Sequence, residues 1–247
     1  MASGIELNST SLLDDANLQG YWRLENANDT SDNSYNLTGT APSYVSAKFS
    51  NGGDFESGSS NYLNIADASC ANLEISGSQT WCGWIKAESI AQMAVMGKSD
   101  SGATAWAGLY VNVTTGTVGF NLNGLTGAQI TSDVAIVAGS WYFVAGVYDS
   151  SAGLNKVFVN GTKKEAVASG THTHSDGDFS IGRLGAFSSN WYFDGVIDDC
   201  AIFNRALTDT EINALYYSGL LKDGDWSAPY QIDSDPTKVS GSSNLTN

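Results

Sequence analysis

The sequence has few basic residues. Lysine and arginine together number 11 against 26 aspartate and glutamate residues, which gives a formal net charge of -15. A field of this sign repels polyanions, so nucleic acid and anionic membrane surfaces are poor partners. Clusters of Asp and Asn in loops suit a hard cation such as Ca²⁺, although the same charge is equally consistent with solubility alone.

Cysteine and long apolar runs are also scarce. Cys70, Cys82 and Cys200 cannot all pair within one chain and lack the spacing of a zinc site. Cys82 and Cys200 lie in apolar, strand-like runs, so we expect buried free thiols. No run reaches the roughly 18 apolar residues of a membrane helix, which argues against membrane insertion. The amino terminus shows no secretory leader, so an extracellular place implies a leader already removed, or the exit route of a virus component.

Short strands and turn residues dominate what is present. A chain of 247 residues can form one large β-sandwich, and 27 glycines with abundant aromatic residues favour β structure. Asn160-Gly161 is the strongest hairpin signal, because a type I′ turn needs positive φ at both central positions. Strands without alternating helices predict an antiparallel sandwich. The predicted strands are Tyr21–Leu24, Tyr62–Ile65, Trp81–Lys86, Trp106–Val113, Val118–Leu122, Trp141–Tyr148, Lys156–Val159, Phe179–Gly182 and Phe193–Phe203.

A single helix is predicted near the carboxyl end. Thr208 and Glu211 have the spacing of a capping box, and Gly219 is placed to end the helix. We expect a short amphipathic helix over the rim of the sandwich. The chain therefore divides into an N-terminal arm (1–17), a sandwich (18–221) and a polar C-terminal extension (222–247), and we expect that extension to contact a neighbour.

Four stretches carry a family resemblance. Leu18–Glu25, Gln79–Ala87, Gly139–Asp149 with Lys156–Gly161, and Phe193–Thr208 resemble, in order, the strands of laminin-G-like jelly-roll domains in the concanavalin A-like lectin/glucanase superfamily. The resemblance implies an all-β, two-sheet antiparallel jelly-roll sandwich. It also implies a frequent structural calcium and an accessory role in glycan or protein contact. It does not settle function, because the same sandwich hosts lectins, adhesion modules, glycanases, lyases and scaffolds.

Catalytic patterns are missing from the sequence. Glycanases on this fold need two carboxylates about 5 to 5.5 Å apart for retention and wider for inversion, and the seven glutamates are isolated from one another. His172 and His174 could bind a transition metal with Asp176 or Asp178, but a solvated loop is the simpler interpretation. The sequence therefore predicts no catalytic residues and no enzyme.

A calcium-like pattern follows the first strand. The polar loop around Asp29, Asp32, Asn33 and Asn36 offers several oxygen ligands at short spacing. Turn residues that hydrogen-bond their own backbone explain the loop nearly as well. The adjacent Asp198 and Asp199 lie in an apolar strand, where one must face inward or be neutralised by a cation or by Arg23. We expect Ca²⁺ as the candidate cofactor, bound by residues from these two groups.

Aromatic residues in loops form the candidate ligand site. Trp106, Phe187, Trp191 and Tyr192 lie in or beside Gly-, Ser- and Asn-rich segments, where rings can stack on the apolar faces of sugars. Core or rim packing is the competing interpretation.

Three functional hypotheses remain. The first is a non-catalytic surface recognition or adhesion module that contacts glycan or protein through rim loops, on an extracellular or virion surface. The second is a structural or decoration protein of a virus particle, whose termini contact neighbouring copies or other virion proteins. The third, which has least support, is a polysaccharide hydrolase or lyase.

Overall fold

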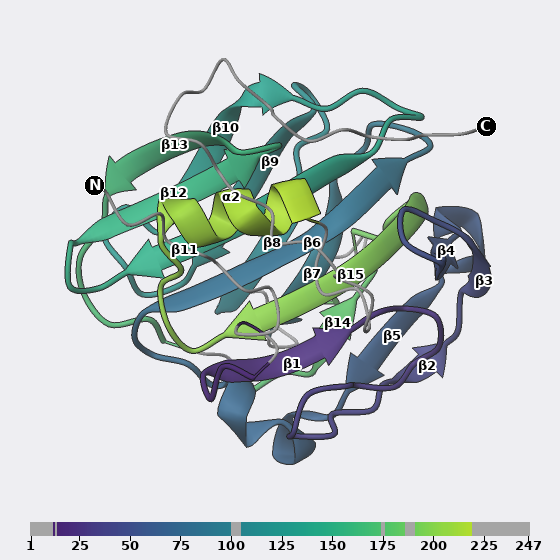
Figure 1. Ribbon diagram of the computed structural model, residues 1–247, viewed down its shortest axis with the longest axis horizontal. Coiled ribbons are helices and arrows are strands. Elements are labelled where there is room, and N and C mark those ends of the chain that lie inside the picture. The colour runs from purple at the N-terminus through teal and green to yellow at the C-terminus, as the bar shows by residue number, and fades with distance from the viewer. Residues whose placement is uncertain (1–11, 13, 100–104, 174–175, 186–190, 219–247) are drawn as a thin grey trace, which may run out of the picture.

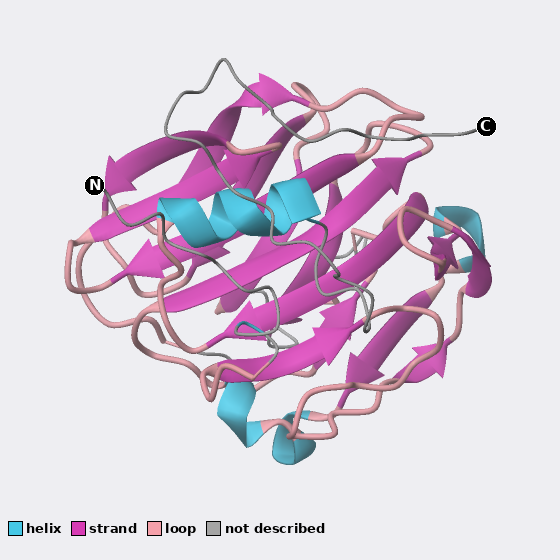
Figure 2. Ribbon diagram, viewed as in Figure 1, coloured by secondary structure: helices cyan, strands magenta, loops and turns pink. Residues whose placement is uncertain are grey.

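Two antiparallel sheets packed face to face make up the protein (Figure 1). The computed structural model describes residues 12, 14–99, 105–173, 176–185 and 191–218. Strands are the main regular structure in this part of the chain (Figure 2). Between them lie three short 3₁₀ turns, η1 (Ser57–Ser59), η2 (Asp67–Ser69) and η3 (Ala71–Leu73).

Sheet A has eight strands in the order β13-β12-β11-β6-β15-β4-β3, and β1 also pairs with β15. Its strands are β1 (Leu18–Trp22), β3 (Ser43–Ser46), β4 (Asn51–Phe55), β6 (Gln79–Ala87), β11 (Tyr142–Asp149), β12 (Leu154–Val159), β13 (Thr162–Val167) and β15 (Gly195–Phe203).

Sheet B has seven strands in the order β10-β9-β8-β7-β14-β5-β2. Its strands are β2 (Thr38–Thr40), β5 (Tyr62–Ile65), β7 (Met93–Ser99), β8 (Trp106–Val111), β9 (Thr117–Leu122), β10 (Gln129–Ala135) and β14 (Phe179–Ile181). All strand pairs in both sheets are antiparallel, so the predicted two-sheet sandwich is confirmed.

Apolar side chains from the inner faces of both sheets form the main core. Alternate residues of each strand point inward, as the two-residue period of a strand requires. On β8, for example, Ala107, Leu109 and Val111 belong to this core. Trp22 stacks on Phe179 across the sandwich, with ring centroids 5.0 Å apart.

The helix α2 (Asp209–Ser218) lies across the outer face of sheet A, in front of β11 and β6 in Figure 1. Ile212 and Leu215 are buried in a second apolar cluster with the outward side chains of sheet A. Tyr216 stacks on Trp84 of β6, with centroids 6.0 Å apart. The predicted helix is confirmed, but its position over the rim is wrong, because outward apolar residues such as Phe143 on β11 give it a face to cover. The core between the sheets is therefore not the sole apolar cluster.

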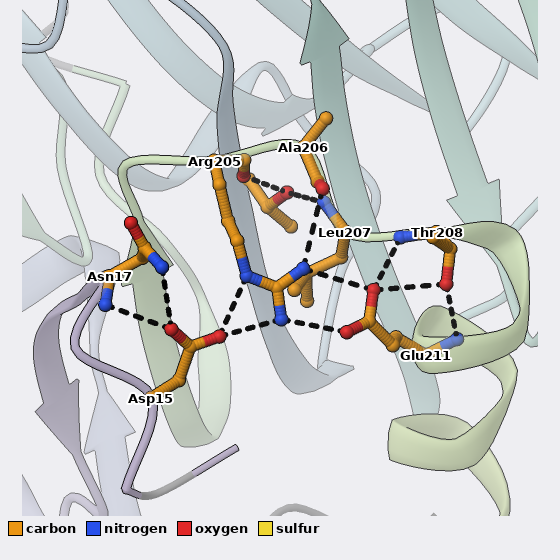
Figure 3. Close-up of polar contacts among 8 residues, drawn as sticks. Asp15, Asn17, Arg205, Ala206, Leu207, Thr208 and Glu211 are labelled. Atoms are coloured by element: carbon orange, nitrogen blue, oxygen red, sulfur yellow. Dashed lines mark hydrogen bonds and ion pairs between the residues drawn. The ribbon is translucent and has the colours of Figure 1, made fainter. Parts of the chain in front are cut away.

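The capping box of α2 forms as predicted and extends into an ion-pair network (Figure 3). The Glu211 backbone N–H donates to the Thr208 hydroxyl oxygen at 3.2 Å. The Thr208 N–H donates to the Glu211 carboxylate at 2.7 Å. Arg205 then joins Glu211 to Asp15, with guanidinium-to-oxygen distances of 2.7 and 2.6 Å. This network fixes the start of the helix to the segment that precedes β1.

The β12–β13 hairpin turns at the predicted dipeptide. Asn160 and Gly161 have φ values of 49° and 78°, as a type I′ turn requires, and Val159 pairs with Thr162.

Candidate functional site

An aromatic cluster lies on the outer face of sheet B. Trp106 and Tyr110 are four residues apart on β8 and therefore point to the same face, away from the inward Leu109. The Trp191 ring meets Trp106 at 5.5 Å and Tyr110 at 5.6 Å between centroids. Buried Ala94 and Leu184 pack beneath these rings, and Trp106 and Trp191 remain half-exposed.

The backbone around this cluster makes room for the rings. Gly119 on β9 lies opposite Tyr110, and a Cβ at this glycine would come within 2.1 Å of the Tyr110 ring. Gln129 on β10 donates a hydrogen bond to the Tyr110 hydroxyl. The Ala94 N–H donates to the Trp191 carbonyl oxygen at 2.9 Å, and Trp191 has a φ of 39°. A left-handed tryptophan is a strained conformation that is often found at functional positions.

The predicted ligand residues separate into two neighbouring groups. Trp106 and Trp191 meet in the aromatic cluster. Tyr192 instead lies beside Tyr62 of β5, with centroids 6.4 Å apart. Phe187 lies outside the described residues. Tyr110 was not predicted, although its four-residue spacing from Trp106 on a strand was a signal that could have identified it.

In the predicted calcium loop, the side chains are engaged with the protein itself. Asp29 is buried and accepts hydrogen bonds from the Tyr21, Ser31 and Tyr35 backbone N–H groups and from the Ser31 hydroxyl. Asn36 accepts from the Asp29 N–H at 3.0 Å. Each Asp29 carboxylate oxygen therefore already accepts two hydrogen bonds, and this aspartate organises the loop.

The other two residues predicted in this loop do not join Asp29. Asn33 accepts from the Asn72 side-chain amide at 2.8 Å and donates to the Gln19 carbonyl. The Asp32 side chain is exposed. The side chains of Asp29, Asn33 and Asn36 thus fit a metal ion poorly.

Asp198 and Asp199 fit a cation better. Both are almost fully buried, at 0% and 2% exposure. Tyr21 donates from its hydroxyl to Asp199 at 2.8 Å, and the Phe49 N–H donates to Asp198 at 2.8 Å. One oxygen of each aspartate, Oδ1 of Asp198 and Oδ2 of Asp199, is buried without a hydrogen-bond partner. Two orphaned carboxylate oxygens on adjacent residues are of the kind that a hard cation binds.

A β-bulge accounts for this placement. Asp198 pairs with Trp84 and Ala201 with Cys82, so β15 has one residue more than β6 between these pairs. Asp199 takes the left-handed conformation there, with a φ of 49°. Strict alternation would turn one aspartate into the core, whereas the bulge brings Asp199 within reach of the Tyr21 hydroxyl, which lies on the helix side of sheet A.

Burial sets the electrostatics of the pair. It raises the pKa of Asp198 to about 7, against the opposing hydrogen bond from Phe49. Burial and the neighbouring Asp198 charge raise the pKa of Asp199 well above its usual range. Arg23 lowers the pKa of Asp199 only in part, and it pairs with Glu25 at 3.0 Å. The pair therefore needs a proton or a cation.

A third group of acids was not predicted from the sequence. Asp54, Glu56 and Glu88 have carboxylate oxygens within 4.8 Å of one another. Gly195 pairs with both Phe55 and Ala87, which brings the residues next to those two positions together. The neighbouring charges of Glu88 and Asp54 raise the pKa of Glu56. The expectation that every glutamate is isolated is therefore wrong for Glu56 and Glu88, and only the sheet register could have revealed it.

The histidine loop is not solvated at His172. This residue is 4% exposed, and its Nδ1 lies 2.7 Å from the Asn123 carbonyl oxygen. His174 lies outside the described residues. Asp178 accepts hydrogen bonds from the Asn64 side chain and the Asp67 N–H. The simpler interpretation of His172 as solvated was wrong, because the loop folds back onto Asn123.

Cys82 and Cys200 are buried free thiols, as predicted, and Cys70 is a third. Cys200 belongs to the core between the sheets and Cys82 to the cluster under the helix, so they lie on opposite faces of sheet A. Among the described residues, no helix combines the length and apolar character needed to cross a membrane.

These features define a lectin-like β-sandwich with an aromatic outer face and a buried acidic pair. A family profile described as the concanavalin A-like lectin/glucanases superfamily, of the laminin-G type, matches residues 57–213. The chain belongs to this family, and the predicted resemblance is confirmed. No curated protein sequence matches the chain.

Solved structures share the fold at low sequence identity. Domain 4 of AbnA, an extracellular arabinanase from Geobacillus stearothermophilus in complex with arabinotriose, is similar with a TM-score of 0.62 and 18% identity, over 81% of this chain and 98% of that domain. The binding domain of Paraclostridial Mosquitocidal Protein 1 has a TM-score of 0.65 and 16% identity, over 83% of this chain. The binding domain of Botulinum Neurotoxin DC in complex with SialylT has a TM-score of 0.58 and 13% identity, also over 83% of this chain. The chain spans 53% and 52% of these two toxin structures.

Proposed function

We propose that this protein is a non-catalytic recognition module that binds glycan through the aromatic cluster on the outer face of sheet B. The observation that carries the proposal is the meeting of Trp106, Tyr110 and Trp191, with every centroid pair within 5.6 Å and both tryptophans half-exposed. Tryptophan rings offer a large, flat apolar surface with one polar edge, which suits the apolar face of a pyranose ring.

Neutral polar groups border these rings. Asn121 lies next to Trp106, because its side-chain amide donates to the Trp106 carbonyl oxygen at 2.9 Å. The Gln129 side-chain amide donates a hydrogen bond to the Tyr110 hydroxyl. A few polar groups around an apolar surface are typical of sites that fix the orientation of a small ligand. The similar structures of an arabinanase domain with arabinotriose and a toxin domain with SialylT agree with a glycan partner.

The proposal of a non-catalytic role rests on where the acidic side chains lie relative to the aromatic cluster. A glycosidase needs a pair of carboxylates that flank the bound sugar. Asp198 and Asp199 are buried on the helix side of sheet A, and the side chains of the aromatic cluster carry no charge. Glu56 and Glu88 are exposed. Like charges raise the pKa of Glu56, but neither side chain is held in the buried environment that usually tunes a catalytic acid or base. A polysaccharide-degradation screen that detects turnover would overturn this part of the proposal.

We also propose Ca²⁺ at Asp198 and Asp199, supported by their two orphaned oxygens. The ion would neutralise the pair and tie β15 to β1 through Tyr21. Because the pair and the aromatic cluster lie on different sheets, the ion would stabilise the fold and would not contact the sugar.

The place of action that suits a glycan-binding module is outside the cell or on a particle surface. Protein contacts and the alternative role of a structural or decoration protein of a virus particle remain predictions. They depend on the arm and the C-terminal extension, which lie largely or wholly outside the described residues.

Glycan-array binding tests the main proposal. Trp191→Ala should abolish specific signal, because it removes the ring that meets both other rings. Tyr217→Ala is the matched control, since Tyr217 is 62% exposed on α2 over the opposite sheet, and this variant should bind as the unaltered protein does. An unaltered protein with no glycan signal, or a Trp191→Ala variant with full signal, would contradict the proposal.

A further inference from the structure

Arg183 lies beside the aromatic cluster and is held by a ring. It follows β14 after Gly182, and its guanidinium carbon is 3.6 Å from the centroid of the Tyr62 ring. This distance places the guanidinium flat or nearly flat against Tyr62, as in a strong cation–π contact. The Tyr62 ring also contacts the Tyr192 ring, with centroids 6.4 Å apart.

The chain connects this group directly to the cluster. Leu184, next to Arg183, packs with the cluster, and so does Trp191, next to Tyr192. Adjacent Cα atoms are about 3.8 Å apart, so two separate chain links join the groups. Arg183, Tyr62 and Tyr192 therefore continue the aromatic face toward β5.

Arg183 differs from the two other arginines of the chain. Arg23 pairs with Glu25, and Arg205 pairs with both Asp15 and Glu211. Arg183 forms no ion pair with any residue that the structure describes, in a chain with a net charge of -15. Its Nε is buried and has no hydrogen-bond partner there.

The chemistry of a guanidinium identifies what would complete it. One flat face of Arg183 rests on Tyr62, and a guanidinium carries its N–H donors at its edge, in the plane of the group. A planar fork of N–H donors matches the two oxygens of a carboxylate. A half-buried cation with no counter-charge among the described residues can accept an anion from outside the protein.

We infer that the aromatic face selects acidic saccharides, with the sugar carboxylate bound by Arg183 and the neighbouring ring packed on the Trp191 side of the cluster. This inference rests on the proposed function and adds the class of ligand. The carboxylate can come from a uronic acid or from a sialic acid, and the same N–H groups would receive either one.

Calorimetric titration with matched sugar pairs tests the inference on the full chain. One pair is 3′-sialyllactose and lactose, and the other is trigalacturonic acid and its methyl ester. We expect at least one acidic sugar to bind tenfold or more tightly than its neutral partner. Added salt should weaken binding of that acidic sugar and leave the neutral one unchanged, since it screens only the charged pair. The responding pair identifies the source of the carboxylate.

Variants separate the charge from the rings. Arg183→Gln should remove the preference for the acidic sugar and leave the binding of the neutral sugar unchanged. Arg183→Lys should keep part of the preference, because lysine keeps the positive charge but lacks the planar fork of N–H donors. Lys164→Gln is the control, since that half-exposed cation on sheet A is paired with Asp133. If Arg183→Gln does not fold, the salt dependence and the Arg183→Lys variant still decide the question.

The failures of the two proposals are distinguishable. Equal binding of acidic and neutral sugars that is lost in Trp191→Ala would overturn the acidic preference and keep the glycan-binding function. A preference retained by Arg183→Gln, or a lack of binding to both acidic sugars, would overturn the role of Arg183. Failure to bind any glycan on an array would overturn both proposals.

Discussion

The buried pair Asp198 and Asp199 makes the stability of the protein depend on pH in an unusual direction. Burial raises the pKa of Asp198 to about 7, whereas an unfolded aspartate titrates at about 3.9. Between these values the folded protein holds a proton that the unfolded chain has lost. The stability that this group contributes is therefore fully present below about pH 4 and is lost as the pH rises through about 7.

The magnitude follows from the same difference. Each pKa unit corresponds to about 1.4 kcal/mol, so ionising Asp198 in the metal-free native protein costs about 4 kcal/mol. A change of that size is a large part of the stability of a typical domain. Urea unfolding at a series of pH values, with a chelator present, should show the free energy of unfolding falling between about pH 4 and 8 by at least this amount, because the raised pKa of Asp199 adds to the loss.

Calcium should reverse the trend. An ion that binds only the folded protein stabilises it by about 2.7 kcal/mol at a hundredfold excess over its dissociation constant. Because the proton competes for the same oxygens, the gain should grow as the pH rises. Asp198→Asn should raise stability at pH 8 in chelator and lose the response to calcium. Asp133→Asn, which changes a side chain that is 74% exposed, should do neither.

Three results would each refute part of this reasoning. A stability that stays level or rises from pH 4 to 8 in chelator would contradict the raised pKa of Asp198. A calcium response that survives in Asp198→Asn would move the ion to another site. A pH profile as expected without any calcium response would leave a shared proton, and the proposal of a metal would be withdrawn.

Three further predictions concern the fold. Thr208→Ala should lower the free energy of unfolding by about 1 kcal/mol, because the Glu211 N–H loses its cap, and urea denaturation measures this. Gly161→Ala should destabilise by about 1 kcal/mol or more, since φ is 78° and the new Cβ would lie 2.6 Å from an amide oxygen; a thermal melt with no shift would contradict the turn. Burial raises the pKa of Cys82 and Cys200, so a thiol reagent at pH 8 should label neither until denaturant is added, and rapid labelling of the native protein would contradict their burial.

The local signals in the sequence predicted much of the fold. Each predicted strand corresponds to an observed one, and the Asn160-Gly161 turn and the Thr208–Glu211 cap form where the residue pattern placed them. These features depend on neighbours within a few residues, which the sequence displays directly. The short edge strands β2 and β3 lack such a local signal. Both are largely exposed and show no apolar alternation, so they were missed.

The strand β7 was missed for the opposite reason. All seven of its residues, Met93–Ser99, are buried, so it shows no alternation of apolar and polar residues. One buried face is the core between the sheets, and the other lies under Trp191 and Leu184. A strand that is covered on both faces is hard to distinguish by pattern from other short apolar runs.

The candidate sites depended more on register than on pattern. The sequence indicated that Asp198 and Asp199 are anomalous, but only the bulge against β6 shows how both side chains are accommodated. Asp54 and Glu88 are 34 positions apart in the sequence, and a shared strand, β15, brings them together. Long-range strand pairing of this kind produces no local sequence pattern near either residue, so the sequence alone does not predict it.

The two outer faces of the sandwich differ, and the difference bears on function. The outward aromatic residues of sheet A, such as Trp84 and Phe143, are buried under α2, and helix packing accounts for their presence. Those of sheet B pack on one another and on Ala94 and Leu184, with Trp106 and Trp191 half-buried, and Trp191 has a φ of 39°. A domain that needed only stability would gain by burying these rings under a helix, as it does on the other face. The difference between the two faces therefore agrees with the proposed glycan site on sheet B, which the Trp191→Ala variant tests.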